Sequence, residues 1–436
     1  MSRIFAHDAA LFKKWGWNPP RQRGDFPFGD QPPLTNPQRL ARFFAGRDDE
    51  VRRAVRALYY GQNVLVRGTW GIGKTAFILS VLHALQGEAR AQGVSLLATY
   101  AHEFNDRDAS LDGFYRAVLY SLARAMTEMG DDVAIRILQD LAGIEVTRGR
   151  KKKATLSGKV GIASLGELSG AVETGAEDTQ ALQVTKNAKH HIDTLLGRAQ
   201  RDNIRVVVAL DDMDKVKDYG AVRQMLVDGK ALLRNAPCNF ILTGRAMVAA
   251  WEDFSPLVLE LFREPVHLGR LPEEALHRAA VGQLNTIRKS ASDGIHPFEE
   301  DALRDAIGLS RGFPRLFNKL CWSALQYALE MGTDRITCEM FRASFDRLKG
   351  DVSVNVPLEV RRLLYRLAQK GRLALGRGAE VEELLREQGV DRVYELVAQF
   401  HQYIQKDWIL AEEEQGRLVF SVSPLAAGAA EEGKPE

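Results

Sequence analysis

The stretch GTWGIGKT, from Gly68 to Thr75, constrains this chain more than any other segment. It follows the short apolar segment 63–66 and combines a glycine, four intervening residues and a Gly-Lys-Thr triplet, which is the spacing of a phosphate-binding loop. Glycines let several backbone N–H groups turn toward one anion, and the N-terminus of the following helix adds its dipole. The alternative is a chance glycine-rich turn, but a location between a strand and a helix favours the phosphate-binding loop.

The side chains of this stretch indicate a nucleoside triphosphate bound together with a metal ion. Lys74 supplies a positive charge to the β- and γ-phosphates, and the hydroxyl of Thr75 is a suitable ligand for Mg²⁺. The residues that we expect to bind the nucleotide in this loop are Gly68, Gly71, Ile72, Gly73, Lys74, Thr75 and Ala76.

Two aspartates follow a second apolar segment, VVVALDDMDK, which spans residues 206–215. Ligands of open α/β sheets bind at the carboxyl ends of the strands, so Asp211 is placed to hold Mg²⁺ and Asp212 to polarise an attacking water. The alternative is an N-cap cluster at the start of a helix, where aspartate is favoured. Asp212 is one methylene shorter than the glutamate more usual as a base, which predicts slow hydrolysis.

A third apolar segment, FILTGR over 240–245, ends in Thr243. If its strand lies beside the strand that ends at Asp211, the threonine hydroxyl comes near the γ-phosphate. The alternative is an ordinary strand end. The three segments together predict one site at the carboxyl edge of a sheet.

Strands and helices alternate over the first 270 residues. We expect strands over 63–66, 94–101, 204–210, 239–243 and 265–268, and helices over 74–85, 111–126, 179–199, 222–233 and 246–262. Continuous Val/Ile/Leu strands separated by helices predict a parallel sheet that is covered on both faces, as in an α/β fold.

The chain divides into five parts by composition and periodicity. We expect an aromatic, proline-rich arm of little regular structure over 1–40, the nucleotide-binding domain over 41–270, an all-helical part over 271–350, a winged-helix-like domain over 351–425 and a disordered tail over 426–436. Within the second part, residues 144–175 carry the basic run RGRKKK and predict an inserted hairpin. In the fourth part, we expect strands over 408–411 and 417–422 around a turn at 412–416.

Composition excludes several classes of protein. With 59 basic and 57 acidic residues the net charge is +2, so nucleic acid could be bound only by a local patch. Three cysteines without CxxC spacing and nine histidines without metal-ligand spacing predict neither a disulfide framework nor a zinc site. No apolar stretch approaches the roughly 20 residues that cross a bilayer, and the N-terminus lacks the apolar segment of a secretory signal. We therefore expect a cytoplasmic protein without a membrane partner.

With these three strand-end segments in order, the chain resembles the AAA+ ATPases over residues 40–350. It is most similar to their origin-recognition and transposition-type branch and to the related STAND signalling ATPases. FFAGRDDE over 43–50 looks like the motif ahead of the nucleotide pocket and adds Gly46 and Arg47 as nucleotide contacts. Thr243 matches the sensor 1 position of the family.

Two arginines also match positions of the family. Arg263 stands where AAA+ proteins place an arginine finger for the neighbouring subunit, although a helix-end arginine that stabilises the dipole is an equal alternative. Gly312-Phe313-Pro314-Arg315 is similar to the GxPR box, whose arginine, Arg315 here, reaches the γ-phosphate from the lid as sensor 2.

The resemblance implies a P-loop NTPase fold with a five-stranded parallel sheet in the order 5-1-4-3-2 and a helical lid. It also implies ATP with Mg²⁺ as cofactors, hydrolysis to ADP and phosphate with Asp212, Thr243, Arg263 and Arg315 as catalytic residues, and homo-oligomers that form around ATP. A sensor arginine can contact the γ-phosphate only when that phosphate is present. ATP therefore favours the closed arrangement of the lid more than ADP does.

Two outputs remain open at the level of sequence. The chain could act on double-stranded DNA in replication, transposition or antiviral genome defence, through its winged helix and the basic run 148–153. Alternatively, it could be a STAND-like switch whose partner is a protein effector encoded nearby. Residues 351–423 hold ten basic and twelve acidic side chains, a poor footprint for a dedicated DNA reader. A small-molecule kinase would need neither the lid nor the C-terminal domain.

Overall fold

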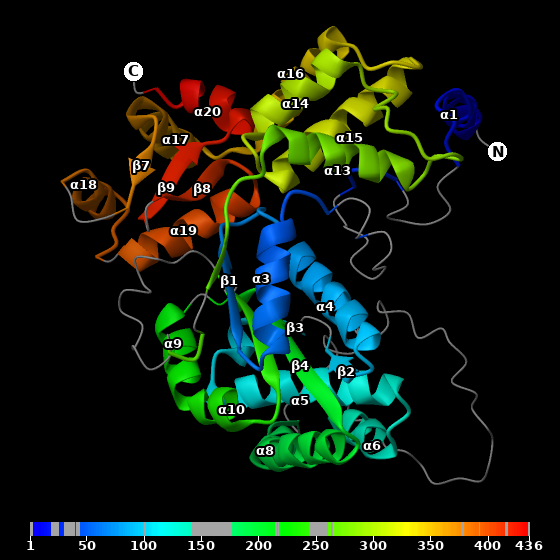
Figure 1. Cartoon of the computed structure of the whole chain (residues 1–436). Coiled ribbons are helices and arrows are strands. Elements are labelled where there is room, and N and C mark those ends of the chain that lie inside the picture. Colours follow the sequence, from blue (N-terminus) through cyan, green and yellow to red (C-terminus); the bar gives the residue numbers. More distant parts are fainter. Residues whose placement is uncertain are drawn as a thin grey trace.

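The structure is a computed structural model of the chain (Figure 1). It describes residues 3–18, 26–29, 40, 44–99, 102–141, 177–213, 216, 218–244, 260–262, 265–375, 379–391, 393–414 and 417–434. The basic run 148–153 with the rest of the expected insertion, residue Arg263 and most of the helix expected over 246–262 lie outside these residues. Within the described part of the chain, no helix combines the length and the apolar character needed to cross a bilayer.

The central sheet is parallel and consists of β1 (Val64–Gly68), β2 (Ser95–Ala98), β3 (His102–Glu103), β4 (Ile204–Asp211), β5 (Asn239–Gly244) and β6 (Val266–Leu268). Its order is β2-β4-β5-β1-β6, and the short β3 also pairs with β4. Counted without β3, which the sequence did not predict, this is the order 5-1-4-3-2. The predicted P-loop NTPase fold is therefore confirmed.

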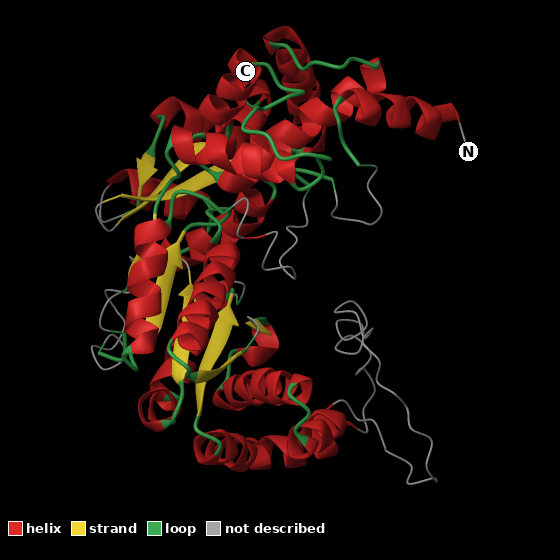
Figure 2. Ribbon diagram, turned by 45° about the vertical axis from the view of Figure 1, so that its right-hand side comes forward, coloured by secondary structure: helices red, strands yellow, loops and turns green. Residues whose placement is uncertain are grey.

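Alternate residues of β4 face opposite layers of helices, as a period of two requires. Val207 and Ala209 pack with the first layer, and Val206, Val208 and Leu210 pack with the second. The first layer holds α3 (Asp48–Tyr59) and α4 (Lys74–Ala91). The second holds α5 (Leu111–Glu128), α6 (Asp132–Leu141), α8 (Glu177–Arg201), α9 (Tyr219–Asp228) and α10 (Lys230–Asn235), with the 3₁₀ turn η1 (Asp106–Asp108) before α5. Figure 2 shows these helices on both sides of the sheet.

The lid consists of α13 (Glu273–Asn285), α14 (Glu300–Ser310), α15 (Pro314–Met331) and α16 (Cys338–Asn355). Most of its buried apolar residues, among them Leu276, Phe313 and Leu320, belong to the same apolar cluster as Val66 of β1 and Leu268 of β6. The lid and the first face of the sheet therefore share a core.

The N-terminal arm packs its aromatic rings on the lid. The rings of Trp15 and Trp17 lie 4.6 Å apart, and Phe26 contacts Trp322 of α15 edge-on at 4.9 Å. Trp15 Nε1 donates a hydrogen bond of 3.0 Å to the carbonyl of Asp334. The arm also contains a helix, α1 (Arg3–Lys14), where we expected little regular structure.

A winged-helix domain follows the lid. It consists of α17 (Leu358–Lys370), β7 (Leu373–Ala374), α18 (Ala379–Glu387), α19 (Val393–Gln405), β8 (Ile409–Glu414) and β9 (Arg417–Val422). The strands form an antiparallel sheet in the order β7-β9-β8. The two-residue β7 was not predicted, and β8 includes Glu412–Glu414, which we had assigned to a turn.

The expectation of a disordered tail over 426–436 is wrong for residues 426–432, which belong to η3 (Pro424–Ala426) and α20 (Ala427–Glu432). Ala429 and Ala430 are buried, and Arg361 of α17 forms an ion pair with Glu432 at 2.6 Å. Small alanine side chains let α20 approach α17 closely. The composition of the tail did not reveal this helix, because the apolar surface that buries its alanines belongs to residues far away in the sequence.

The arm yields a prediction about stability. Trp17 is 1% exposed, so Trp17→Ala should lower the free energy of unfolding by about 3–5 kcal/mol, as a large cavity in a core does. Chemical denaturation followed by circular dichroism measures the change. The control is Tyr60→Ala, because that ring is 68% exposed and its removal should cost less than about 0.5 kcal/mol. Equal losses in the two variants would contradict a stabilising role for the arm.

Candidate nucleotide site

The loop between β1 and α4 has the backbone conformation of an anion-binding cradle. Gly71 and Gly73 adopt left-handed φ values of 76° and 95°, and Gly73 is the N-cap of α4. A Cβ at Gly68 would lie 2.9 Å from Ile72 Cγ2, so a side chain there would push the loop apart. The loop therefore requires glycine at these three positions. It forms a concave turn in which backbone N–H groups can point toward one bound anion.

Lys74 lies over this loop. It is 6% exposed, and its Nζ donates to the carbonyls of Gly68 at 3.2 Å and Thr69 at 3.3 Å. Thr75 and Ala76 follow in the first turn of α4, where the helix dipole favours negative charge. The ammonium group is thus held beside the cradle.

Asp211 and Thr243 meet at the carboxyl edge of the sheet. Both are fully buried, at the ends of the adjacent strands β4 and β5, and Thr243 Oγ1 donates to Asp211 Oδ1. Thr243 is also the register partner of Val66, two residues before Gly68. The structure therefore brings these two predicted residues together beside the strand that leads into the cradle.

Asp212 follows in an uncommon backbone conformation. Its φ is 58°, in the left-handed region, and its N–H donates to Asp211 Oδ1 and to Thr243 Oγ1, both at 2.9 Å. Non-glycine residues rarely adopt this conformation, although aspartate tolerates it better than most. The two hydrogen bonds hold it in place.

The residues Gly46 and Arg47 connect the start of the domain to the cradle and the lid. Gly46 has a φ of 77°, and a Cβ there would overlap with Ala275 of α13. Arg47 is 4% exposed, and its Nη2 donates to the carbonyls of Gly269 at 2.5 Å and Ile72 at 3.4 Å. Burial lowers the pKa of Arg47 to about 10, and the nearby Glu50 opposes this shift, so the guanidinium remains charged at neutral pH. Its contacts connect the loop to the end of β6.

The first residues of α15 lie against the cradle. The N–H of Arg315 donates to the carbonyl of Gly71 at 3.3 Å, and a Cβ at Gly71 would lie 3.2 Å from Arg315 Cβ. Gly312 has a φ of 81° and packs against the backbone of Leu271. The GxPR box thus places the start of α15 beside the phosphate-binding loop.

The side chain of Arg315 extends toward the winged helix. Its Nη2 donates to the carbonyl of Gln405 at 3.2 Å, its Nε lies 3.8 Å from Asp407 Oδ1, and its guanidinium lies 5.6 Å from the ring centre of Trp70. Trp70 is itself packed against the winged-helix core and contacts His401 edge-on at 5.3 Å.

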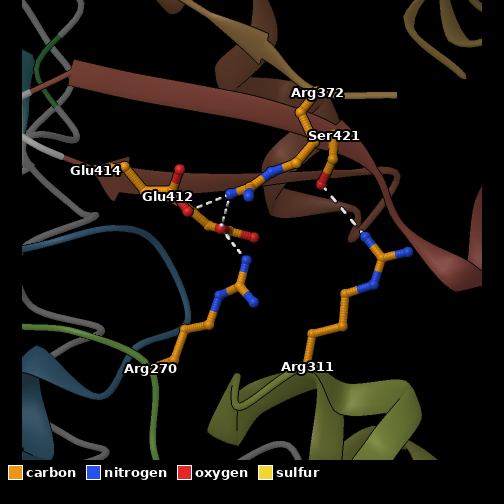
Figure 3. A network of polar contacts seen from close by, with 6 residues as sticks. All are labelled: Arg270, Arg311, Arg372, Glu412, Glu414 and Ser421. Atoms are coloured by element: carbon orange, nitrogen blue, oxygen red, sulfur yellow. Dashed lines mark hydrogen bonds and ion pairs between the residues drawn. The ribbon is translucent and has the colours of Figure 1, made fainter. Parts of the chain in front are cut away.

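The winged helix also contributes acidic residues to the edge of the site, which sequence reasoning missed. Glu413 forms an ion pair with Arg67 of β1 at 3.2 Å, and its Oε2 lies 3.2 Å from Nδ1 of His267 in β6. Glu412 pairs with Arg270, as Figure 3 shows, and with Arg372 at 2.7 Å. The run of three glutamates was visible in the sequence, but only their pairing in β8 places them beside the phosphate-binding loop.

A cavity of about 230 Å³ lies at this junction. It is lined by Thr69 and Ile72 of the loop, Leu268 of β6, Phe313 of the lid and Glu412–Glu414 of β8. Loop, sheet, lid and winged helix therefore meet around one space.

The residues present fit a nucleotide with a divalent cation. The glycine cradle suits a phosphate chain, and Thr75 and Asp211 offer the oxygen ligands that Mg²⁺ prefers. This geometry defines a P-loop nucleotide-binding protein. The family model described as AAA ATPase domain matches residues 44–237, a range that includes the phosphate-binding loop and Asp211.

Comparison with solved structures gives three similar chains. ORC1 of Aeropyrum pernix in complex with DNA is 15% identical, with 92% of this chain and 95% of that chain covered and a TM-score of 0.47. ORC2 of the same organism is 13% identical, with 95% and 98% covered and a TM-score of 0.46. The RuvB Holliday junction branch migration motor of Thermotoga maritima is 14% identical, with 90% and 97% covered and a TM-score of 0.43. A search of curated protein sequences finds no match.

The buried hydrogen bonds of Thr243 yield a second prediction. Thr243→Val should lower the free energy of unfolding by about 1–3 kcal/mol, because Asp211 loses one of its donors and the N–H of Asp212 loses one acceptor. Urea denaturation measures the change. Thr243→Ser keeps the hydroxyl and should retain most of the stability, so the same loss in both variants would show that the methyl group matters rather than the hydrogen bonds.

Proposed function

We propose that this chain is an ATP-driven molecular switch, which binds ATP with Mg²⁺, hydrolyses it slowly and converts the state of the nucleotide into a rearrangement of its lid and winged helix. The observation that carries the proposal is the contact between Gly71 of the phosphate-binding loop and Arg315 at the start of α15. Bound phosphates would therefore lie next to the lid. The side chain of Arg315 would connect them to the winged helix.

Each predicted residue has a role in this proposal. Gly68, Gly71 and Gly73 cradle the phosphates through backbone N–H groups, and Lys74 neutralises their charge. Bound Mg²⁺ supplies electrostatic stabilisation of the phosphate oxygens. Thr75 and Asp211 would hold that ion, and Thr243 orients Asp211 through their hydrogen bond.

Hydrolysis requires a group that orients water, and we assign this role to Asp212. Its side chain is one methylene shorter than that of glutamate, which supports a slow reaction and suits a switch that persists in the ATP state. Arg263 is proposed to act on the nucleotide of a neighbouring subunit in an ATP-dependent homo-oligomer.

For the output, the described contacts favour a protein partner. The third helix of a winged helix is the one that enters the major groove, and α19 contains neither lysine nor arginine. Of the basic residues of the domain, Arg361, Arg366, Lys370 and Arg372 each form an ion pair with a glutamate. Double-stranded DNA is the second candidate, because the fold is a winged helix and the basic run 148–153 offers phosphate contacts.

Fluorescence anisotropy with a labelled DNA duplex separates these outputs. If DNA is the partner, binding should weaken steeply as salt rises and the duplex should stimulate ATP hydrolysis severalfold. A protein effector predicts no stimulation by DNA and co-purification with the product of a neighbouring gene.

The first test of the proposal is ATP binding itself. Lys74→Ala should abolish binding measured by calorimetry with Mg²⁺ present, because the β- and γ-phosphates lose their main counter-charge. Lys230→Ala is the matched control, since Lys230 is an exposed lysine of α10, and it should bind ATP like the unchanged protein. If the unchanged protein releases no heat with ATP, the proposal fails.

A mixing experiment tests Arg263. The Arg263→Ala protein should bind ATP but not hydrolyse it when assembled. When it is mixed with Lys74→Ala protein, hydrolysis should return, because the second protein supplies the arginine and the first supplies the bound nucleotide. Normal hydrolysis by Arg263→Ala alone would refute a role in the neighbouring subunit.

A further inference from the structure

Asp407 is a buried carboxylate at the junction of the lid and the winged helix. It follows α19, its side chain is 9% exposed, and its φ of 57° is left-handed. Two cations of α15 reach it: Lys319 Nζ lies 3.0 Å from Oδ2, and Arg315 Nε lies 3.8 Å from Oδ1. Arg315 and Lys319 are one helical turn apart, so both face the same carboxylate.

The guanidinium of Arg315 is held by the winged helix on more than one side. Besides Asp407, it donates to the carbonyl of Gln405 at 3.2 Å. Trp70 lies beside it and packs into the winged-helix core. The backbone of Arg315 touches the phosphate-binding loop, whereas its charged group is engaged by residues 405–407.

The contact of Arg315 with residues 405–407 is a small part of the interface between the winged helix and the rest of the protein. Glu412 independently joins the winged helix to Arg270 (Figure 3), and Glu413 joins it to Arg67 and His267. Loss of the Asp407 contact alone therefore leaves the winged helix attached. Its specific effect is on where the guanidinium of Arg315 is held.

We infer that Asp407 is a positioning residue that holds Arg315 away from the nucleotide, so that the winged helix and the γ-phosphate compete for one guanidinium. The inference rests on the proposed function, in which Arg315 contacts the γ-phosphate. ADP lacks that phosphate and leaves Arg315 with Asp407. By linkage, ATP then loosens the contact at residues 405–407, and a partner that draws the winged helix away tightens ATP binding.

The decisive variant is Asp407→Asn, which keeps the shape of the side chain and tolerates the left-handed backbone. Removal of the competing charge should raise the preference for ATP over ADP by about three- to tenfold, because a larger fraction of molecules has Arg315 available. Calorimetric titration with each nucleotide measures the two dissociation constants. The affinity for ADP should remain unchanged.

Two controls separate this effect from a general weakening of the interface. Lys319→Gln removes the other cation from Asp407 but does not free Arg315, so the preference for ATP should not rise. Glu387→Gln breaks an ion pair with Arg366 within the winged helix and should change neither affinity. A rise in Lys319→Gln equal to that in Asp407→Asn would overturn the inference, as would no rise in Asp407→Asn.

Hydrogen exchange of the unchanged protein gives a second measurement that needs no variant. ATP should increase exchange at residues 405–407 relative to ADP, and equal exchange in the two states would overturn the inference. Failure of the proposed function is distinguishable, because then neither nucleotide would bind the unchanged protein at all.

Discussion

The close contact between the phosphate-binding loop and the start of α15 is the interaction on which the rest of the structure depends. It requires glycine at position 71, where a side chain would press on Arg315, and glycine at 312, where the chain passes the backbone of Leu271. Because the lid shares its core with one face of the sheet, the loop, the lid and the sheet form one packed unit. The winged helix then docks on that unit at the same place.

The winged helix docks through charges as well as apolar contacts, since Leu410 belongs to the core that the lid shares with the sheet. Glu412 and Glu413 are nearly buried, yet Arg270 and His267 opposite them are about two-fifths exposed. Ion pairs of this kind contribute modestly, since desolvation of the charges offsets much of their attraction. The charged part of the interface can respond to a single phosphate group, because that group carries comparable charge.

Much of the fold could be predicted from the sequence, because its signals are local. Apolar strands such as Ile204–Asp211 and the glycines of the loop determine the type of element within a few residues. The alternation of strands and helices predicts a parallel sheet. The order of its strands was predicted from the family resemblance, and the structure confirms it. The strands β3 and β7, each of two residues, were missed, because they depend on partners far along the chain. The tail was misjudged for the same reason, since α20 is stabilised by α17 rather than by its own composition. The roles of Asp212, Arg263 and Arg315 stay predictions.

By itself, the sequence determined the phosphate-binding loop and the residues that end the strands, because backbone freedom at glycine and the chemistry of lysine, threonine and aspartate are properties of single residues. Only the tertiary structure decided that Asp211 and Thr243 share a hydrogen bond and that Asp407 and Arg315 meet across 92 residues of chain. Such pairs arise from strand order and from the docking of one domain on another. Strand order and domain docking depend on the packing of whole apolar faces, which cannot be inferred from a short stretch of sequence.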